Sequence, residues 1–181
     1  MSNEKDVALQ RLFHSVCVLE TRNIINLKDI FDVYREKLMA DIGLTHVALG
    51  VTDINKSIAF YQKYAGMKVV HRRTDETNNC EVAWISDLTR PFVIVLLQLD
   101  KSQCQPSPGF HIGVACKSRE EVDYLCQQAK SEGVLQAGPD DYGAPVGYWA
   151  FIRDPDGYQL EIAYGQEVNV TIVQAQQQGK G

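Results

Sequence analysis

The chain has 181 residues, of which 45% are hydrophobic and 23% charged, and its formal net charge is −5. This length suits one domain with a substantial core, or two small modules that share one. The negative charge offers no basic footprint for nucleic acid or an anionic membrane surface. No apolar run reaches the roughly 18 residues of a membrane span, and charged residues interrupt the start of the chain. We therefore expect a cytoplasmic protein that binds neither nucleic acid nor membrane.

Residues 1–42 have the apolar spacing of helices rather than strands. Two stripes are predicted, with a break near residues 22–26. The apolar faces of such a helical extension must pack on the rest of the chain or on a second copy, so a homodimer is possible. The residues of the two stripes are Leu9, Leu12, Phe13 and Val16, and then Leu27, Ile30, Phe31, Tyr34 and Leu38.

Short strands and tight turns follow, in a first module over 43–100. After an initial strand, Asp53 supplies an N-cap for a helix that runs to about Tyr64, and Gly66 ends that helix. Three more strands complete the module. The predicted strands are 44–51, 68–73, 81–86 and 92–99.

The same order of elements occurs again in a second module over 109–166, after a linker with two prolines. A capping box from Ser118 to Glu121 begins a helix that ends near Gly133. The predicted strands are 110–116, 134–137, 148–153 and 158–164, with a loop over 138–147. Each module has the order strand, helix and three strands. This repetition predicts an α+β fold built from an internal duplication. The tail, 167–181, is predicted to be a short apolar strand followed by a Gln-rich stretch without fixed structure.

A turn of Asp154, Pro155, Asp156 and Gly157 joins the last two strands of the second module. Beyond it, alternation places Glu161 on a strand that is predicted to be mostly buried, and a buried carboxylate needs a partner, a proton or a metal. His46 and His111 open equivalent strands of the two modules. Gln98 lies two residues further from His46 than Glu161 lies from His111. Because side chains on a strand alternate with a period of two, this even difference would keep Gln98 on the same sheet face as Glu161. His46, Gln98, His111 and Glu161 are therefore candidates for one inward-facing set.

Two neutral imidazoles and a carboxylate on rigid strands suit a divalent first-row ion such as Fe, Mn, Co, Ni or Zn. The amide oxygen of Gln98 would be a fourth, weaker ligand. Taken alone, each residue has an ordinary explanation, such as a hydrogen-bonded histidine, a solvated glutamate or a common turn. The equivalent positions of the two histidines favour the metal site.

Three further residues are candidates for substrate binding. Arg73 shares a predicted strand face with His71, and this pair could dock an anionic group, although a solvated charged face is the simpler interpretation. Trp149 and Phe151 precede the turn and could line a pocket with apolar surface. Core packing is an equally good explanation for both aromatic residues.

Three segments carry a family resemblance. They are residues 46–61, which begin His-Val-Ala-Leu-Gly-Val-Thr-Asp, the motif Gly-Phe-His-Ile-Gly-Val at 109–114, and residues 151–162, with Asp-Pro-Asp-Gly-Tyr-Gln-Leu-Glu. Together they resemble the vicinal oxygen chelate superfamily of glyoxalases, bleomycin resistance proteins and extradiol dioxygenases. The resemblance covers about 44–165. It implies paired βαβββ modules whose curled mixed sheet encloses a metal cleft, with ligands on the first and last strands. His46, His111 and Glu161 match three such positions, and Gln98 or a neighbour lies at the fourth.

The resemblance implies a divalent-metal-dependent, glyoxalase-like lyase or isomerase that acts on a small substrate with adjacent oxygens, with Glu161 also moving protons. Glyoxalase I enzymes usually place a Glu on the last strand of the first module, which 92–99 lacks. Extradiol dioxygenases have a Tyr where Phe151 stands, and a His that 141–149 lacks. Methylmalonyl-CoA epimerases resemble the His, Gln, His, Glu set, and fosfomycin-resistance transferases use His, His and Glu. An extradiol-type dioxygenase relative and a non-catalytic binding or resistance protein remain the alternatives.

Overall fold

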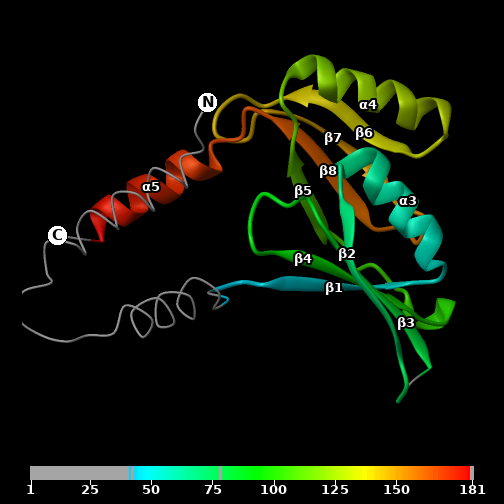
Figure 1. Cartoon of the computed structure of the whole chain (residues 1–181). Coiled ribbons are helices and arrows are strands. Elements are labelled where there is room, and N and C mark those ends of the chain that lie inside the picture. The colour runs from blue at the N-terminus through cyan, green and yellow to red at the C-terminus, as the bar shows by residue number, and fades with distance from the viewer. Residues whose placement is uncertain (1–40, 42, 78, 180–181) are drawn as a thin grey trace, which may run out of the picture. The chain divides into compact units, whose positions relative to one another are not determined.

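The computed structural model describes residues 41, 43–77 and 79–179. The chain divides into two units, Met1–Gly43 and Leu44–Gly181, and all the elements discussed below belong to the second (Figure 1). The predicted helices of the N-terminal extension lie outside the described residues.

The second unit contains two four-stranded mixed sheets, each with one helix after its first strand. In both sheets the first strand runs parallel to the last, and the remaining pairs are antiparallel. The predicted α+β architecture of two βαβββ modules is confirmed. The first sheet has the order β1-β4-β3-β2 and the second β5-β8-β7-β6. Their elements are β1 (His46–Val51), α3 (Ile54–Ala65), β2 (Lys68–Asp75), β3 (Cys80–Ser86), β4 (Val93–Gln98), β5 (His111–Ala115), α4 (Arg119–Ser131), β6 (Leu135–Asp141), β7 (Tyr148–Arg153) and β8 (Gln159–Tyr164), with a short 3₁₀ helix, η1 (Lys101–Gln103), between the modules.

Both helices begin at the predicted caps. The Asp53 carboxylate accepts hydrogen bonds from the backbone N–H groups of Asn55 and Lys56, and Gly66 ends α3 in the left-handed region at φ +60°. At α4 the Ser118 hydroxyl accepts from the backbone N–H of Glu121. The Glu121 carboxylate accepts a hydrogen bond from the backbone N–H of Lys117. In a standard capping box it would accept from the N–H of Ser118, so this second bond is shifted by one residue.

The prediction for the tail was wrong. Residues Val168–Gln178 form a helix, α5, instead of an apolar strand and an unstructured stretch. Its β-branched first half favours a strand, but an isolated strand leaves its backbone groups unpaired, whereas a helix satisfies them internally. The Ala and Gln residues that follow also favour a helix. β6 is longer than predicted and takes in part of the expected 138–147 loop.

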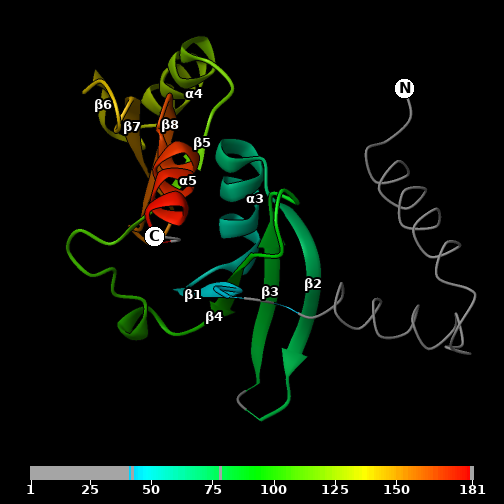
Figure 2. The same cartoon turned by 90° about the vertical axis from the view of Figure 1, so that its left-hand side faces the viewer.

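Each sheet has one covered face and one open face. In the first sheet, Leu49, Ile94 and Ile85 face α3 and are at most 1% exposed. In the second, Leu160, Ile162 and Ile152 are fully buried on the side that α4 covers. The buried residues of α3, α4 and both sheets form one continuous core, and α3 runs between the first sheet and the second module (Figure 2). The alternate residues of each strand therefore point to the open faces.

The β7–β8 turn connects the two modules. Its Asp154 carboxylate is 4% exposed and accepts from the backbone N–H groups of Asp156 and Tyr158, which shapes the turn. The same carboxylate accepts from the Tyr61 hydroxyl of α3 at 3.1 Å. Asp156 in turn accepts from both the N–H and the hydroxyl of Thr52, at the end of β1. One local turn thus holds the second module against the first.

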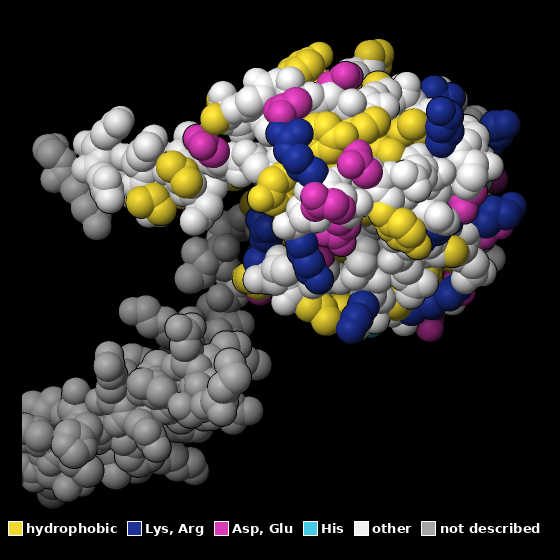
Figure 3. All heavy atoms as spheres, turned by 90° about the horizontal axis from the view of Figure 1, so that it is seen from above, with side chains coloured by type: hydrophobic (Ala, Val, Ile, Leu, Met, Phe, Trp, Pro, Cys, Tyr) yellow, Lys and Arg dark blue, Asp and Glu magenta, His cyan; other side chains and the backbone are white. Residues whose placement is uncertain are grey.

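On the face shown in Figure 3, acidic and basic side chains are interspersed around apolar patches, and exposed apolar side chains also appear on α5. Among the helices that the structure describes, none combines the length and the apolar character needed to cross a membrane.

Replacing Tyr61 with Phe should destabilise the protein, because the buried Asp154 carboxylate loses a donor from the other module. Hydrogen bonds to charged groups contribute about 1.5–3 kcal/mol, so a loss in that range is expected in urea unfolding. Tyr64→Phe is the matched control. The Tyr64 hydroxyl donates to Glu132, whose side chain is 44% exposed, so this change should cost less than about 1 kcal/mol. Equal losses for the two variants would contradict the role given to Asp154.

Stability should also depend on pH through Asp154. Burial raises the pKa of this carboxyl group, against the opposing effect of its hydrogen bonds. A raised folded-state pKa means that the folded protein holds the proton more tightly than the unfolded chain does. Relative to Asp154→Asn, the wild type should therefore lose stability as pH rises through the raised pKa. Unfolding free energies of both proteins at a series of pH values test this, and a difference that stays constant or grows with pH would refute it.

Candidate metal site

The structure brings His111 and Glu161 together on the open face of the second sheet. β5 and β8 run parallel, with His111 beside Gln159 and Gly113 beside Glu161, so both side chains point to the same face. The His111 Nε2 atom lies 3.2 Å from Oε2 of Glu161. Glu161 is 8% exposed, as its predicted burial required. The buried carboxylate therefore has the imidazole partner that its position demanded.

The orientation of His111 suits a metal ligand. Its Nδ1 lies 3.0 Å from the carbonyl oxygen of Gly109. A carbonyl only accepts hydrogen bonds, so Nδ1 must carry the proton, and Nε2 is the atom directed at Glu161. Nε2 then either donates a second proton to the carboxylate or presents its lone pair to a cation beside it. A histidine fixed through its other ring nitrogen is the usual arrangement in metal sites, so the donor set fits a divalent ion.

Sequence reasoning missed Gln166. Its side-chain Nε2 donates to Oε1 of Glu161 at 2.7 Å. The residue lies just beyond β8, in the segment before α5, and no motif or spacing in the sequence marks it. The two oxygens of Glu161 therefore have separate partners, His111 on one and Gln166 on the other.

An aromatic row continues from His111 across the open face. The ring centroid of His111 lies 5.4 Å from that of Phe151, which lies 5.0 Å from that of Trp149. Tyr142, in the loop before β7, extends the row at 5.2 Å from Trp149. Phe151 is paired with Glu161 in the β7–β8 register. Phe151 and Trp149 are thus beside the His–Glu pair, where the sequence analysis placed substrate contacts.

His46 lies on the open face of the first sheet. It is exposed, and its Nδ1 lies 3.0 Å from the Thr45 hydroxyl, which leaves Nε2 available. The strand register places it beside Val93, and the face that it shares is mostly apolar. Within the described part of one chain, no three His, Cys, Asp or Glu side chains converge as metal ligands would. His46 therefore does not complete a three-ligand group with His111 and Glu161 in a single chain.

Gln98 lies on the other face of the first sheet. β1 and β4 pair His46 with Val93 and Val51 with Gln98, so Gln98 points to the same side as the buried Val51. Its Oε1 accepts from the backbone N–H of Ile54, the first residue of α3. The expectation that Gln98 shares a face with His46 is wrong. The residue equivalent to Glu161, two positions beyond the partner of the histidine, is Val95.

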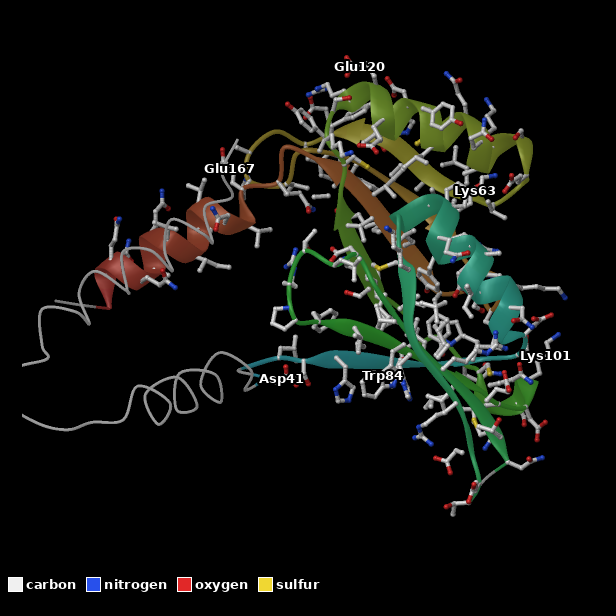
Figure 4. All side chains as sticks on the ribbon, viewed as in Figure 1. Asp41, Lys63, Trp84, Lys101, Glu120 and Glu167 are labelled. Atoms are coloured by element: carbon white, nitrogen blue, oxygen red, sulfur yellow. The ribbon has the colours of Figure 1, made fainter. Side chains whose placement is uncertain are left out.

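The expectation that His71 and Arg73 share a face is confirmed. β2 and β3 pair His71 with Trp84 and Arg73 with Val82, on the open side of the first sheet. The rings of His71 and Trp84 lie 5.0 Å apart, and Figure 4 shows Trp84 on the side away from α3. Arg73 forms an ion pair with Asp75 at 3.3 Å. The face that carries His46 therefore also carries a cationic side chain.

A separate cavity of about 580 Å³ lies between the β3–β4 connection and the edge strand β5. Its lining is mostly apolar and does not include His46, His111 or Glu161. The candidate site is thus on the open faces and not in this cavity. The lining residues are Leu44, Ala65, Met67, Ile85, Ser86, Asp87, Thr89, Arg90, Phe92, Ile94, Ile112, Gly113, Val114 and Ala115.

The fold and the site define a protein of paired βαβββ modules that carries a histidine–carboxylate pair on a first and a last strand. Residues 43–162 match the model of the Glyoxalase/Bleomycin resistance protein/Dioxygenase superfamily. The chain belongs to this superfamily, and the resemblance noted in the sequence is confirmed.

Two relatives match about two thirds of the chain in sequence. An uncharacterised protein of Pseudomonas aeruginosa is 36% identical over 126 residues, which cover 68% of this chain and 89% of that protein. The lactoylglutathione lyase of Neisseria meningitidis is 32% identical over 126 residues, covering 66% of this chain and 88% of that enzyme.

Solved structures share the fold. A possible glyoxalase from Bacillus cereus superposes with a TM-score of 0.54 at 26% identity, over 68% of this chain and 99% of that one. A variant of the fosfomycin resistance protein FosX from Listeria monocytogenes, complexed with Mn(II) and a dihydroxypropylphosphonic acid, gives a TM-score of 0.56 at 23% identity, over 74% of this chain and 99% of that one. The second likeness shows the fold alone.

Proposed function

We propose that the protein is a divalent-metal-dependent lyase or isomerase that acts on a small substrate with two adjacent oxygen atoms. The observation that carries this proposal is the His111–Glu161 pair, with Nε2 and Oε2 3.2 Å apart and Nδ1 held by a backbone carbonyl. His46 is the third ligand. The ion is Fe, Mn, Co, Ni or Zn, all of which accept two imidazoles and a carboxylate. The superfamily match and the lyases among the relatives support this reaction class.

The ligand set is completed by a second copy of the chain. His46 lies on the open face of the first sheet, and His111 and Glu161 lie on the open face of the second. No three such ligands converge among the described residues of one chain, which supports a His46 donated by a partner whose first sheet faces the second sheet. A two-fold symmetric dimer would form two equivalent sites in this way.

When bound, the metal would polarise the two substrate oxygens and stabilise negative charge that develops on them. The chain supplies the remaining functions. Glu161 is the carboxylate beside the reacting atoms, and its Oε2 atom, when released from the ion, would move a proton between adjacent carbons. Phe151 and Trp149 offer apolar surface to the rest of the substrate and exclude water. Arg73, on the face of His46, attracts an anionic substrate group.

Ring cleavage of the extradiol type is less well supported. Phe151 stands against His111 where that chemistry uses a phenol, and its ring carries no hydroxyl group that could act as acid or base. A non-catalytic binding protein is the second candidate, because the aromatic row of Tyr142, Trp149 and Phe151 could hold a planar ligand without chemistry. Turnover of hemithioacetals, catechols and acyl-CoA epimers by metal-loaded protein, assayed side by side, separates the catalyst from the binder.

Mixing two inactive variants tests the shared site. His46→Ala and His111→Ala should each abolish stoichiometric binding of Mn²⁺ or Zn²⁺, measured by elemental analysis after loading and desalting. After subunit exchange in an equal mixture, about half of the dimers contain both variants, and each of these has one intact site, so about a quarter of the wild-type metal should return.

The matched control for this experiment is His71→Ala, on the same open face as His46 but stacked on Trp84, which should bind metal as the wild type does. Metal binding by neither the wild type nor the mixture would refute the proposed function. Wild-type binding without recovery in the mixture would place all ligands in one chain and refute only the shared site.

Val95→Glu should strengthen metal binding. Val95 is the counterpart of Glu161 in the first module and lies on the same face as His46. A carboxylate there would add a fourth protein ligand, so the dissociation constant for Zn²⁺ should fall by about tenfold or more, the scale set by 1.4 kcal/mol. Leu97→Glu, two residues further along that face, is the control for added charge. Equal effects of the two substitutions in competition titrations would contradict the placement of the metal beside Val95.

A further inference from the structure

Glu161 is held from two sides by different kinds of partner. Its Oε2 lies 3.2 Å from His111, whereas its Oε1 accepts from the Gln166 amide at 2.7 Å. An amide NH₂ group only donates, so it cannot compete with the carboxylate for a cation. The contact restricts which oxygen of Glu161 is available.

The backbone around Gln166 is fixed by the loop before β7. β8 ends at Tyr164, and Gly165 turns the chain at φ +81°. Gly147 lies directly against this turn, since a Cβ atom there would be 2.4 Å from the Tyr164 carbonyl oxygen and 3.0 Å from the Gln166 nitrogen. The N–H of Glu167 donates to the carbonyl oxygen of Pro145 at 3.0 Å. Backbone packing on both sides therefore fixes the position of Gln166, so its side chain is not a freely moving surface group.

We propose that Gln166 is a positioning residue for the metal carboxylate, an inference that rests on the function proposed above. By occupying Oε1, it makes Glu161 a ligand through Oε2 alone. A carboxylate with both oxygens free can bind a cation in bidentate fashion and take up a second coordination position. Single-oxygen binding keeps that position open. Such openness favours the proposed substrate class, because two adjacent oxygens need two neighbouring positions on the ion.

Gln166→Met tests this role, because Met has nearly the same length and shape but cannot donate a hydrogen bond. Without the Gln166 donor, Oε1 is free and Glu161 can bind the ion through both oxygens, so the dissociation constant for Mn²⁺ should fall by about tenfold. Free Mn²⁺ is measured by electron paramagnetic resonance. Co²⁺-loaded protein provides a second readout, since its visible absorption spectrum should change if Glu161 shifts from one-oxygen to two-oxygen binding.

Gln127→Met, on the exposed surface of α4, is the matched control and should leave affinity and spectrum unchanged. A metal-free unfolding midpoint equal to that of the wild type confirms that Gln166→Met acts on the site and not on the fold. If wild-type protein binds neither Mn²⁺ nor Co²⁺, the proposed function fails. If the wild type binds and Gln166→Met has the same affinity and spectrum, only the positioning role is overturned.

Discussion

The hydrogen bonds of the buried Asp154 carboxylate are the interactions on which the rest of this domain depends. This carboxylate closes the β7–β8 turn through two backbone N–H groups and receives the Tyr61 hydroxyl from the other module. The turn fixes the register that places Phe151 beside Glu161, and the parallel pairing of β5 with β8 then places His111 within reach of that carboxylate. A single desolvated acid therefore joins the shape of one hairpin, the packing of two modules and the geometry of the candidate site. Because burial opposes its charge, each donor that is lost should weaken this arrangement.

The local features of the fold could be read from the sequence because each depends on neighbouring residues. Asp53, Ser118 and Gly66 act at helix ends as predicted, and the turn at Gly157 and the burial of Glu161 follow from short patterns. Gln98 shows where such reading ends. The duplicated modules pair His46 with Val93 but His111 with Gln159, so the spacing from first to last strand differs between them by an odd number of residues. A one-residue difference moves a side chain to the other face, and only the ladder of hydrogen bonds reveals it.

The two modules share a fold but divide the proposed chemistry unequally. The second contributes an imidazole, a carboxylate and an aromatic row, whereas the first contributes one imidazole on a largely apolar face with Arg73 at its edge. Gln98 instead stabilises the start of α3, through the N–H of Ile54. In the proposed site, the second module would present its carboxylate and aromatic side chains to a substrate, and the first a largely apolar face. The superfamily establishes the framework, and in the proposed function these side chains, which the framework does not dictate, would set the reaction and substrate.

The exposed helix α5 begins just beyond the residue that holds the Glu161 carboxylate. Only Glu167, labelled in Figure 4, separates Gln166 from the first turn of α5. The N–H of Glu167 donates to the carbonyl oxygen of Pro145. The helix carries the exposed apolar side chains Val168, Val170, Ile172 and Val173, the kind of surface that binds other apolar surfaces. The side chain that holds Oε1 of Glu161 therefore lies in the short connection between β8 and this apolar helix.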